Sequence, residues 1–113
     1  MSTQEEVDQF LKDFKVKLSV FGVVFTQRDK NFETLVVLEL TTVNRTELLK
    51  KLTVQDYYKG PTQDSDKGAD LWEFGIKVKQ KDIYIKITMG RINSSVICIS
   101  FHIAERSINH PFK

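Results

Sequence analysis

The sequence predicts an α+β domain in which N-terminal helices pack on a C-terminal antiparallel sheet, a three-stranded meander or larger. In the N-terminal half, apolar residues recur at intervals of three and four, as they do on one face of an α-helix. In the last third, apolar and polar residues alternate along three successive segments, as they do in strands with one buried face. Helical patterns followed by strand patterns are typical of the α+β class.

The chain has 113 residues, 41% of them hydrophobic and 11% aromatic, so residues 1–113 are expected to form a single folded domain. A net charge of +2 is too small by itself to indicate a nucleic-acid-binding protein. The only cysteine, Cys98, excludes an internal disulfide and favours a reduced thiol. No apolar run has the length of a membrane span, and no signal segment is recognisable at the N-terminus. We therefore expect a soluble cytoplasmic protein.

The first helix is predicted from Thr3 to about Phe14, with Ser2 or Thr3 as its N-cap. Four apolar residues at positions i, i+3, i+4 and i+7 form its buried stripe: Val7, Phe10, Leu11 and Phe14. The next segment, Val16–Phe25, alternates at first and then becomes uniformly apolar. Its pattern fits both a continuation of the helix and a buried strand.

A polar turn is expected at Gln27–Asn31, followed by a second helix from Phe32 to about Thr42. A third helix is predicted to begin near Asn44, because Asn44 and Glu47 have the spacing of a capping box.

Thr53 and Asp56 repeat the capping-box spacing, which predicts one further helical turn over Val54–Tyr58. Gly60-Pro61 should end any helix, since proline cannot continue one. The following segment, Thr62–Asp70, is rich in Asp, Ser and Gly and is expected to be a loop.

Three strands are predicted at Trp72–Val78, Ile83–Met89 and Ser95–Ile103. Their apolar positions are expected to face the helices: Trp72, Phe74, Ile76, Val78, Ile83, Ile85, Ile87, Met89, Ile97, Ile99, Phe101 and Ile103. Among the residues that alternate with them are Glu73, Lys77, Tyr84, Lys86, Cys98, Ser100 and His102. The outer face of the sheet thus concentrates groups that transfer protons or hold anions, which makes it the place to expect chemistry.

His102 is the natural general acid of this face, since imidazole has a reference pKa of about 6.5 and both of its forms are accessible near neutrality. Tyr84 could donate a hydrogen bond to a phosphate or relay a proton. If the Gly90–Ser94 loop pairs Met89 with Ile97, Tyr84 lies directly opposite His102. The alternative is that neither residue has a function: His102 is then an exposed or hydrogen-bonded strand histidine, and Tyr84 a half-exposed strand tyrosine.

The position of Glu73 depends on the hairpin between the first two predicted strands. A tight turn at Gln80-Lys81 pairs Val78 with Ile83 and makes Glu73 a surface carboxylate about 13 Å from Tyr84. A wider loop over Ile76–Lys81 places Glu73 beside Tyr84, where it can act as a general base. No Asn-Gly or Asp-Gly fixes the turn, so both forms stay open.

Basic residues are concentrated around the same hairpin: Lys77, Lys79, Lys81, Lys86 and Arg91. They form either a solvated edge that discourages aggregation or a patch that attracts phosphate. Lys86 and Lys77 are the candidates for binding RNA phosphates. Lys59, in the expected loop, could also reach a phosphate and is otherwise an exposed loop lysine.

No metal or cofactor is expected, because no His, Cys, Asp or Glu cluster has the spacing of metal ligands and no Gly-rich phosphate loop is present.

Four segments, in this order, carry a resemblance to a known family: Asp56–Pro61, Leu71–Phe74, Ile83–Ile87 and Ile99–His102. Together they resemble the MqsR family of ribonuclease toxins from bacterial type II toxin–antitoxin pairs, which are related in fold to the RelE-like toxins. The match covers about residues 48–103.

The resemblance implies a RelE-like fold and a metal-independent endoribonuclease that cleaves messenger RNA and is held inactive by an antitoxin protein. It places the family's functional lysine on Lys59 and its functional tyrosine on Tyr84. The chain has Glu73 and His102 where the best-known member has glutamine and lysine. In this respect it resembles other RelE-like toxins, which use a glutamate base and a histidine acid.

The alternative is a non-catalytic α+β module that binds RNA or a protein through the lysine-bearing face of its sheet. It explains the lysines equally well but leaves Tyr84 and His102 without a role. An inert scaffold with a merely solvated polar face is the third reading.

Overall fold

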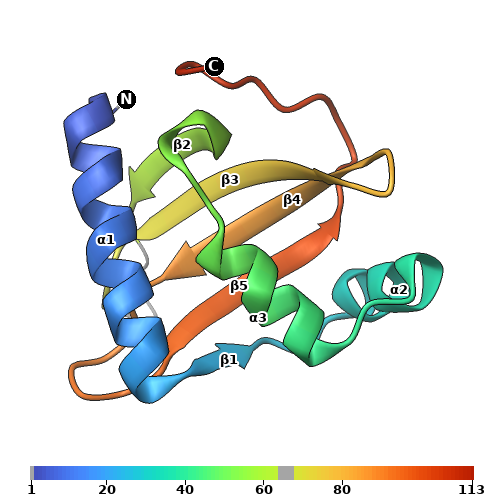
Figure 1. Ribbon diagram of the computed structural model, residues 1–113, viewed down its shortest axis with the longest axis horizontal. Coiled ribbons are helices and arrows are strands. Elements are labelled where there is room, and N and C mark those ends of the chain that lie inside the picture. Colours follow the sequence, from blue (N-terminus) through green and yellow to red (C-terminus); the bar gives the residue numbers. More distant parts are fainter. Residues whose placement is uncertain (1, 64–67) are drawn as a thin grey trace.

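The computed structural model describes residues 2–63 and 68–113 and has the α+β architecture that the sequence predicts (Figure 1). In chain order its elements are α1 (Gln4–Phe21), β1 (Val23–Phe25), α2 (Asp29–Leu38), α3 (Thr42–Lys50), the 3-10 turn η1 (Val54–Asp56), β2 (Tyr57–Thr62), β3 (Leu71–Val78), β4 (Lys81–Thr88) and β5 (Val96–Ile103).

The strands form one five-stranded sheet in the order β1-β5-β4-β3-β2. β1 runs parallel to β5, and the other neighbours are antiparallel. The three predicted strands are confirmed as β3, β4 and β5, and β1 and β2 extend the sheet on either side. Among the described residues, no helix is both long enough and apolar enough to span a membrane.

Helix α1 begins where its N-terminal pattern predicts. Thr3 is the N-cap, and the Glu6 carboxylate accepts a 2.9 Å hydrogen bond from the Thr3 backbone N–H, which completes a capping box. The helix continues to Phe21 and ends at Gly22, whose φ of 80° lies in the left-handed region. The segment left open in the sequence is therefore mostly helix, and only its last three residues form a strand.

Helix α2 begins three residues earlier than predicted and ends at Leu38, so the expected polar turn at 27–31 is partly helical. Phe32 and Val36 are both exposed on this helix. The buried side of α2 is instead largely polar, because it carries Asn31 and Thr34, which bond to the edge of β5.

Helix α3 begins at Thr42, two residues before the predicted start near Asn44, and its N-cap is Thr41. Asn44 is the third helical residue, and its side-chain oxygen accepts a 2.9 Å hydrogen bond from the Thr41 backbone N–H. The sequence Thr41-x-x-Asn44 is therefore the capping box of this helix, one turn before the expected one.

The predicted turn after Thr53 is present but shorter. The Asp56 carboxylate accepts a 2.9 Å hydrogen bond from the Thr53 backbone N–H, and η1 ends at Asp56. The next residues, Tyr57–Thr62, were expected to end a helix and begin a loop, and they form strand β2 instead. Of the predicted loop over 62–70, positions 64–67 lie outside the described residues.

Gly60 explains how a Gly-Pro pair fits into strand β2. Its φ is 121°, and a Cβ atom there would lie 2.8 Å from the Leu71 carbonyl oxygen of the neighbouring strand. β2 is the outer strand of the sheet, where a proline without an N–H is tolerated.

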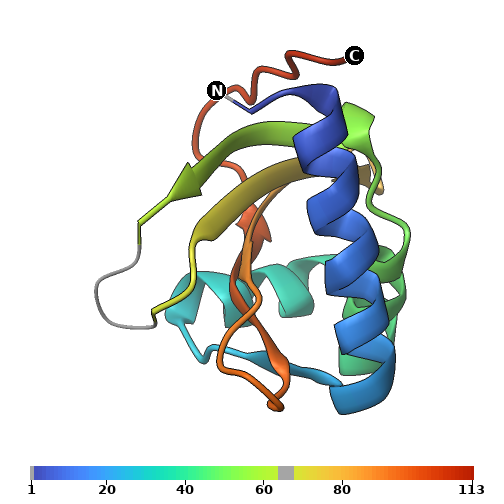
Figure 2. The ribbon, with the colours of Figure 1, turned by 90° about the vertical axis from the view of Figure 1, so that its left-hand side faces the viewer.

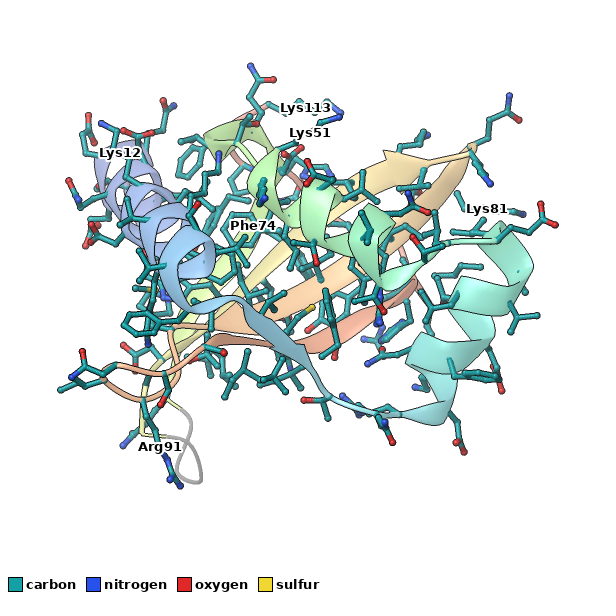
Figure 3. All side chains as sticks on the ribbon, turned by 60° about the horizontal axis from the view of Figure 1, so that its bottom comes forward. Lys12, Lys51, Phe74, Lys81, Arg91 and Lys113 are labelled. Atoms are coloured by element: carbon teal, nitrogen blue, oxygen red, sulfur yellow. The ribbon has the colours of Figure 1, made fainter. Side chains whose placement is uncertain are left out.

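The core lies between α1 and the inner face of the sheet. Phe74, labelled in Figure 3, is fully buried there, whereas the labelled Lys81 and Arg91 lie at the periphery. The Phe10 ring of α1 stacks on Trp72 with ring centroids 4.3 Å apart and also contacts Phe74. The opposite face of the sheet is left for the polar side chains of β2 to β5.

Helix α2 completes the edge of β5 beyond the short strand β1. Asn31 Oδ1 accepts a 3.0 Å hydrogen bond from the Phe101 N–H, and Asn31 Nδ2 donates to the Ile99 carbonyl at 3.1 Å. Thr34 Oγ1 accepts from the Ile103 N–H at 2.8 Å. These bonds replace a neighbouring strand and fix the N-terminus of α2 beside β5.

Candidate functional site

A cavity of about 290 Å³ opens on the outer face of the sheet. Strands β2 to β5, the start of α2 and the segment after β5 all contribute to its lining. Five of the six residues predicted to act in catalysis or phosphate binding line it: Lys59, Glu73, Tyr84, Lys86 and His102. Neighbouring strands of one sheet therefore bring the predicted groups together.

Lys77 does not line the cavity. It lies near the β3–β4 hairpin, where its Nζ is 3.8 Å from the Asp82 carboxylate and its side chain is 69% exposed. Lys79, from the same basic group, donates to the Leu38 carbonyl at 2.6 Å. Of the hairpin cations that the sequence grouped together, Lys86 is the one that lines the cavity.

Tyr84 and His102 are direct neighbours across β4 and β5, with ring centroids 5.3 Å apart. The predicted pairing is present, but its premise is wrong, because Ile97 pairs with Thr88 and not with Met89. A bulge at Ile99 shifts the register by one residue and restores the opposition of Tyr84 and His102.

The same bulge changes which β5 residues face the core. Val96, Cys98 and Phe101 are buried on the inner side, whereas Ser100 and His102 line the outer cavity. The expectation that Cys98 shares the outer face with Ser100 is therefore wrong. The extra residue of a bulge interrupts the alternation of inward and outward side chains, so the residues on its two sides follow different parities.

Glu73 lies next to Tyr84 through a register that neither sequence alternative had. The β3–β4 turn is Lys79-Gln80, both with positive φ, so Val78 pairs with Lys81. Glu73 then opposes Lys86 and lies diagonal to Tyr84. The Tyr84 hydroxyl donates a hydrogen bond to Glu73 Oε1, and Glu73 is only 7% exposed. The reading of Glu73 as a surface carboxylate is wrong.

Lys59 lies on strand β2 and not in a loop, and it pairs with Glu73 of β3. The register shifts between Tyr57 and Lys59, which indicates a bulge at Tyr58. As a result two successive side chains, Tyr58 and Lys59, both line the cavity, with Lys59 Nζ 4.9 Å from the Tyr58 ring centroid.

The segment after β5 forms one wall of the cavity. Figure 2 shows it leaving β5 on the side of the sheet away from α1 and then crossing toward β2. Ile108 lies on Gly75, where a Cβ atom would be 2.7 Å from Ile108 Cδ1. Further along, Phe112 stacks on Tyr57 with ring centroids 5.4 Å apart. The absence of a side chain at Gly75 lets this segment lie close to the sheet.

The cavity carries more positive than negative charge. Its lining includes five cationic side chains, Arg28, Lys30, Lys59, Lys86 and Arg106, and two carboxylates, Glu73 and Glu105. Lys30 pairs with Glu105 at 2.5 Å, and Arg28 donates to Ser100 Oγ at 3.0 Å. Among the described residues, Lys59, Lys86 and Arg106 form no ion pair with a carboxylate. Such an excess of positive charge attracts anions such as phosphodiesters.

Tyr84 is a hydrogen-bond donor in this site. Burial raises the pKa of Tyr84 well above its usual range, and the hydrogen bond to Glu73 and the charge of Glu73 act in the same direction. The phenol therefore stays protonated near neutrality and can orient the Glu73 carboxylate.

His102 is held by its own strand. Its Nδ1 lies 3.0 Å from the Ile103 carbonyl oxygen. Because a carbonyl only accepts, we assign the Nδ1 proton to this bond, which leaves Nε2 to exchange a proton with a ligand.

The alkaline stability of the protein should depend on Cys98. Burial raises the pKa of the Cys98 thiol to about 12, so above about pH 9 the folded state holds a proton that the unfolded state loses. The free energy of unfolding should fall by up to about 1.4 kcal/mol per pH unit from this thiol between about pH 9 and 12. Urea unfolding at several pH values measures the slope, and Cys98→Val should make it shallower. Equal slopes for the two proteins would show that the thiol does not contribute.

Sequence reasoning missed five charged or aromatic side chains of this site, Arg28, Lys30, Tyr58, Glu105 and Arg106. It had placed Ser100 on the outer face without a role, and the structure shows Ser100 holding Arg28. Among residues 2–63 and 68–113, no group of three or more His, Cys, Asp or Glu side chains could hold a metal ion.

No protein-family model, curated protein or solved structure matches the chain. The resemblance to the MqsR family therefore stays a prediction from four short segments.

Proposed function

We propose that the protein is a metal-independent endoribonuclease that cleaves single-stranded RNA, with messenger RNA as its substrate, through attack of the 2′-hydroxyl on the adjacent phosphodiester. One observation carries the proposal. A carboxylate, a phenol and an imidazole, from Glu73, Tyr84 and His102, line one cavity together with cations that have no carboxylate partner among the described residues.

Each group has a step that suits its chemistry. Glu73 accepts the 2′-hydroxyl proton as the O2′–P bond forms, with Tyr84 orienting its carboxylate. His102 donates a proton from Nε2 to the leaving 5′-oxygen as the P–O5′ bond breaks. Lys59 and Lys86 stabilise the negative charge of the phosphorane. The products carry a 2′,3′-cyclic phosphate and a 5′-hydroxyl.

The toxin role rests on the resemblance to the MqsR family. That resemblance supports a cytoplasmic protein that cuts messenger RNA, arrests growth when expressed alone and is neutralised by a cognate antitoxin protein. The four resembling segments include Lys59, Glu73, Tyr84 and His102, all of which line the cavity.

The proposal is tested by incubating the purified protein with a messenger RNA fragment in buffer containing EDTA. The expected result is fragmentation at the same rate with and without the chelator. Binding of the RNA without any fragmentation would favour the non-catalytic module, and loss of cleavage in EDTA would contradict the mechanism.

The rate of RNA cleavage should depend on the two lysines that line the cavity and not on Lys77 near the hairpin. Lys59→Ala and Lys86→Ala are each expected to lower the cleavage rate by roughly 10²-fold, because each removes a cation beside the reacting phosphate. Lys77→Ala is the matched control, since Lys77 belongs to the same sheet but lies outside the cavity. Rates on one RNA fragment at constant salt measure the effects. Equal effects from all three variants would indicate a general charge effect and not a site.

A further inference from the structure

Arg45 of α3 is a buried cation without a carboxylate partner among the described residues. Its side chain is only 7% exposed, and its guanidinium carbon lies 3.9 Å from the centroid of the Phe25 ring. Nη2 donates to Thr42 Oγ1 at 3.3 Å, and Nε is buried with no hydrogen-bond partner. Burial lowers the pKa of Arg45. A buried charge is normally paired, so this one needs an explanation.

Arg45 lines a second cavity, of about 800 Å³, which β1, α2, α3 and the connections between them surround. Its apolar lining includes Val23, Phe25, Phe32 and Leu35. The Phe32 side chain is 67% exposed, so apolar surface continues from the cavity to the outside of α2. Of the residues that line the two cavities, only Arg28 belongs to both.

We propose that this second cavity binds a short apolar segment of a partner polypeptide that carries a carboxylate, and that Arg45 forms the salt bridge to it. A carboxylate matches the planar guanidinium and can accept hydrogen bonds from the Nη groups of Arg45, whereas Nε is buried. Apolar residues on either side of the carboxylate would cover Phe32 and Leu35. The lining also includes one further cation, Arg28, and one carboxylate, Asp29. This mixture of apolar side chains, two cations and a carboxylate suits a peptide better than a nucleic-acid backbone, whose successive phosphates would need several cations.

The inference does not depend on the nuclease proposal, because Arg45 lies outside the first cavity. The cost of burying its charge is explained if the charge is retained for a ligand. The guanidinium would then contribute little to the stability of the free protein, since replacing a buried charge with an apolar side chain of similar size is often neutral or stabilising.

Two matched peptides test the proposal by ¹H–¹⁵N NMR titration of the full chain. They are N-acetyl-Leu-Glu-Leu-amide and the same peptide with glutamine in place of glutamate. The glutamate peptide should shift the backbone amides of Phe25 and Phe32 and the side-chain Nε–H of Arg45. The glutamine peptide should bind at least about tenfold more weakly. Equal shifts with both peptides, shifts elsewhere only, or no shift with either at about 10 mM would overturn the proposal.

Arg45→Met separates a binding role from a structural one. The variant should unfold at the same or a higher urea concentration than the wild type, bind the two peptides equally, and cleave RNA as the wild type does. If Arg45→Met instead lowers the free energy of unfolding by more than about 1 kcal/mol, the guanidinium stabilises the fold and the proposal fails.

Discussion

Replacing His102 with alanine should lower the rate of RNA cleavage by about 10²–10⁴, because the leaving 5′-oxygen loses its general acid. Tyr84→Phe should have a comparable effect, since it removes the hydroxyl that holds Glu73. Both variants should fail to arrest growth when expressed alone. Single-turnover cleavage of one RNA fragment measures the rates.

Both variants are expected to fold like the wild type. Circular dichroism and thermal unfolding should give wild-type spectra and cooperative transitions for both, because His102 and Tyr84 face the outer cavity and not the core. Lys77→Ala is the activity control on the same sheet. Wild-type cleavage by folded His102→Ala or Tyr84→Phe would refute the assignment of that residue.

Replacing Phe74 with alanine should lower the free energy of unfolding by about 3–5 kcal/mol. Phe74 is fully buried between α1 and the sheet, where it contacts the rings of Phe10 and Tyr57, so truncation removes apolar burial and leaves a void. Urea unfolding measures the loss.

Phe32→Ala is the matched control for the core variant. Phe32 is 67% exposed, and its truncation should change the free energy of unfolding by less than about 0.5 kcal/mol. Similar losses for Phe32→Ala and Phe74→Ala would mean that the core is not where the structure places it.

The fold class could be predicted because alternation along β3, β4 and β5 is a local signal of one buried face. Strand β2 could not be predicted, because the local sequence Gly60-Pro61 indicates the end of a secondary-structure element. The segment becomes a strand only through its pairing with β3 at the edge of the sheet. The start of α2 was missed for a similar reason, since its buried side is set by the bonds of Asn31 and Thr34 to β5.

The candidate site was predictable where strand parity decides it. The alternation of β3 and β4 places Glu73, Tyr84 and Lys86 on the outer face. Near the β4–β5 loop the strands pair one residue away from the predicted register, and His102 lies opposite Tyr84 only because the bulge at Ile99 shifts the register by one residue. No sequence signal marks that bulge.

Two of the missed side chains, Arg28 and Arg106, reach the cavity through tertiary packing. Arg28 precedes α2, and Arg106 belongs to the segment that follows β5. Their positions depend on how α2 docks on β5 and on how Ile108 lies on Gly75. Periodicity within strands carries no information on either.

The most direct test of the central claim compares two RNA oligonucleotides in EDTA, one unmodified and one with a single 2′-deoxynucleotide at the mapped cleavage position. The wild-type protein should cut the first to give a 2′,3′-cyclic phosphate and a 5′-hydroxyl, and should leave the second intact at that position. Cleavage of the 2′-deoxy oligonucleotide there, or products that end in a 3′-hydroxyl, would contradict the assignment of Glu73, Tyr84 and His102 to attack by the 2′-hydroxyl.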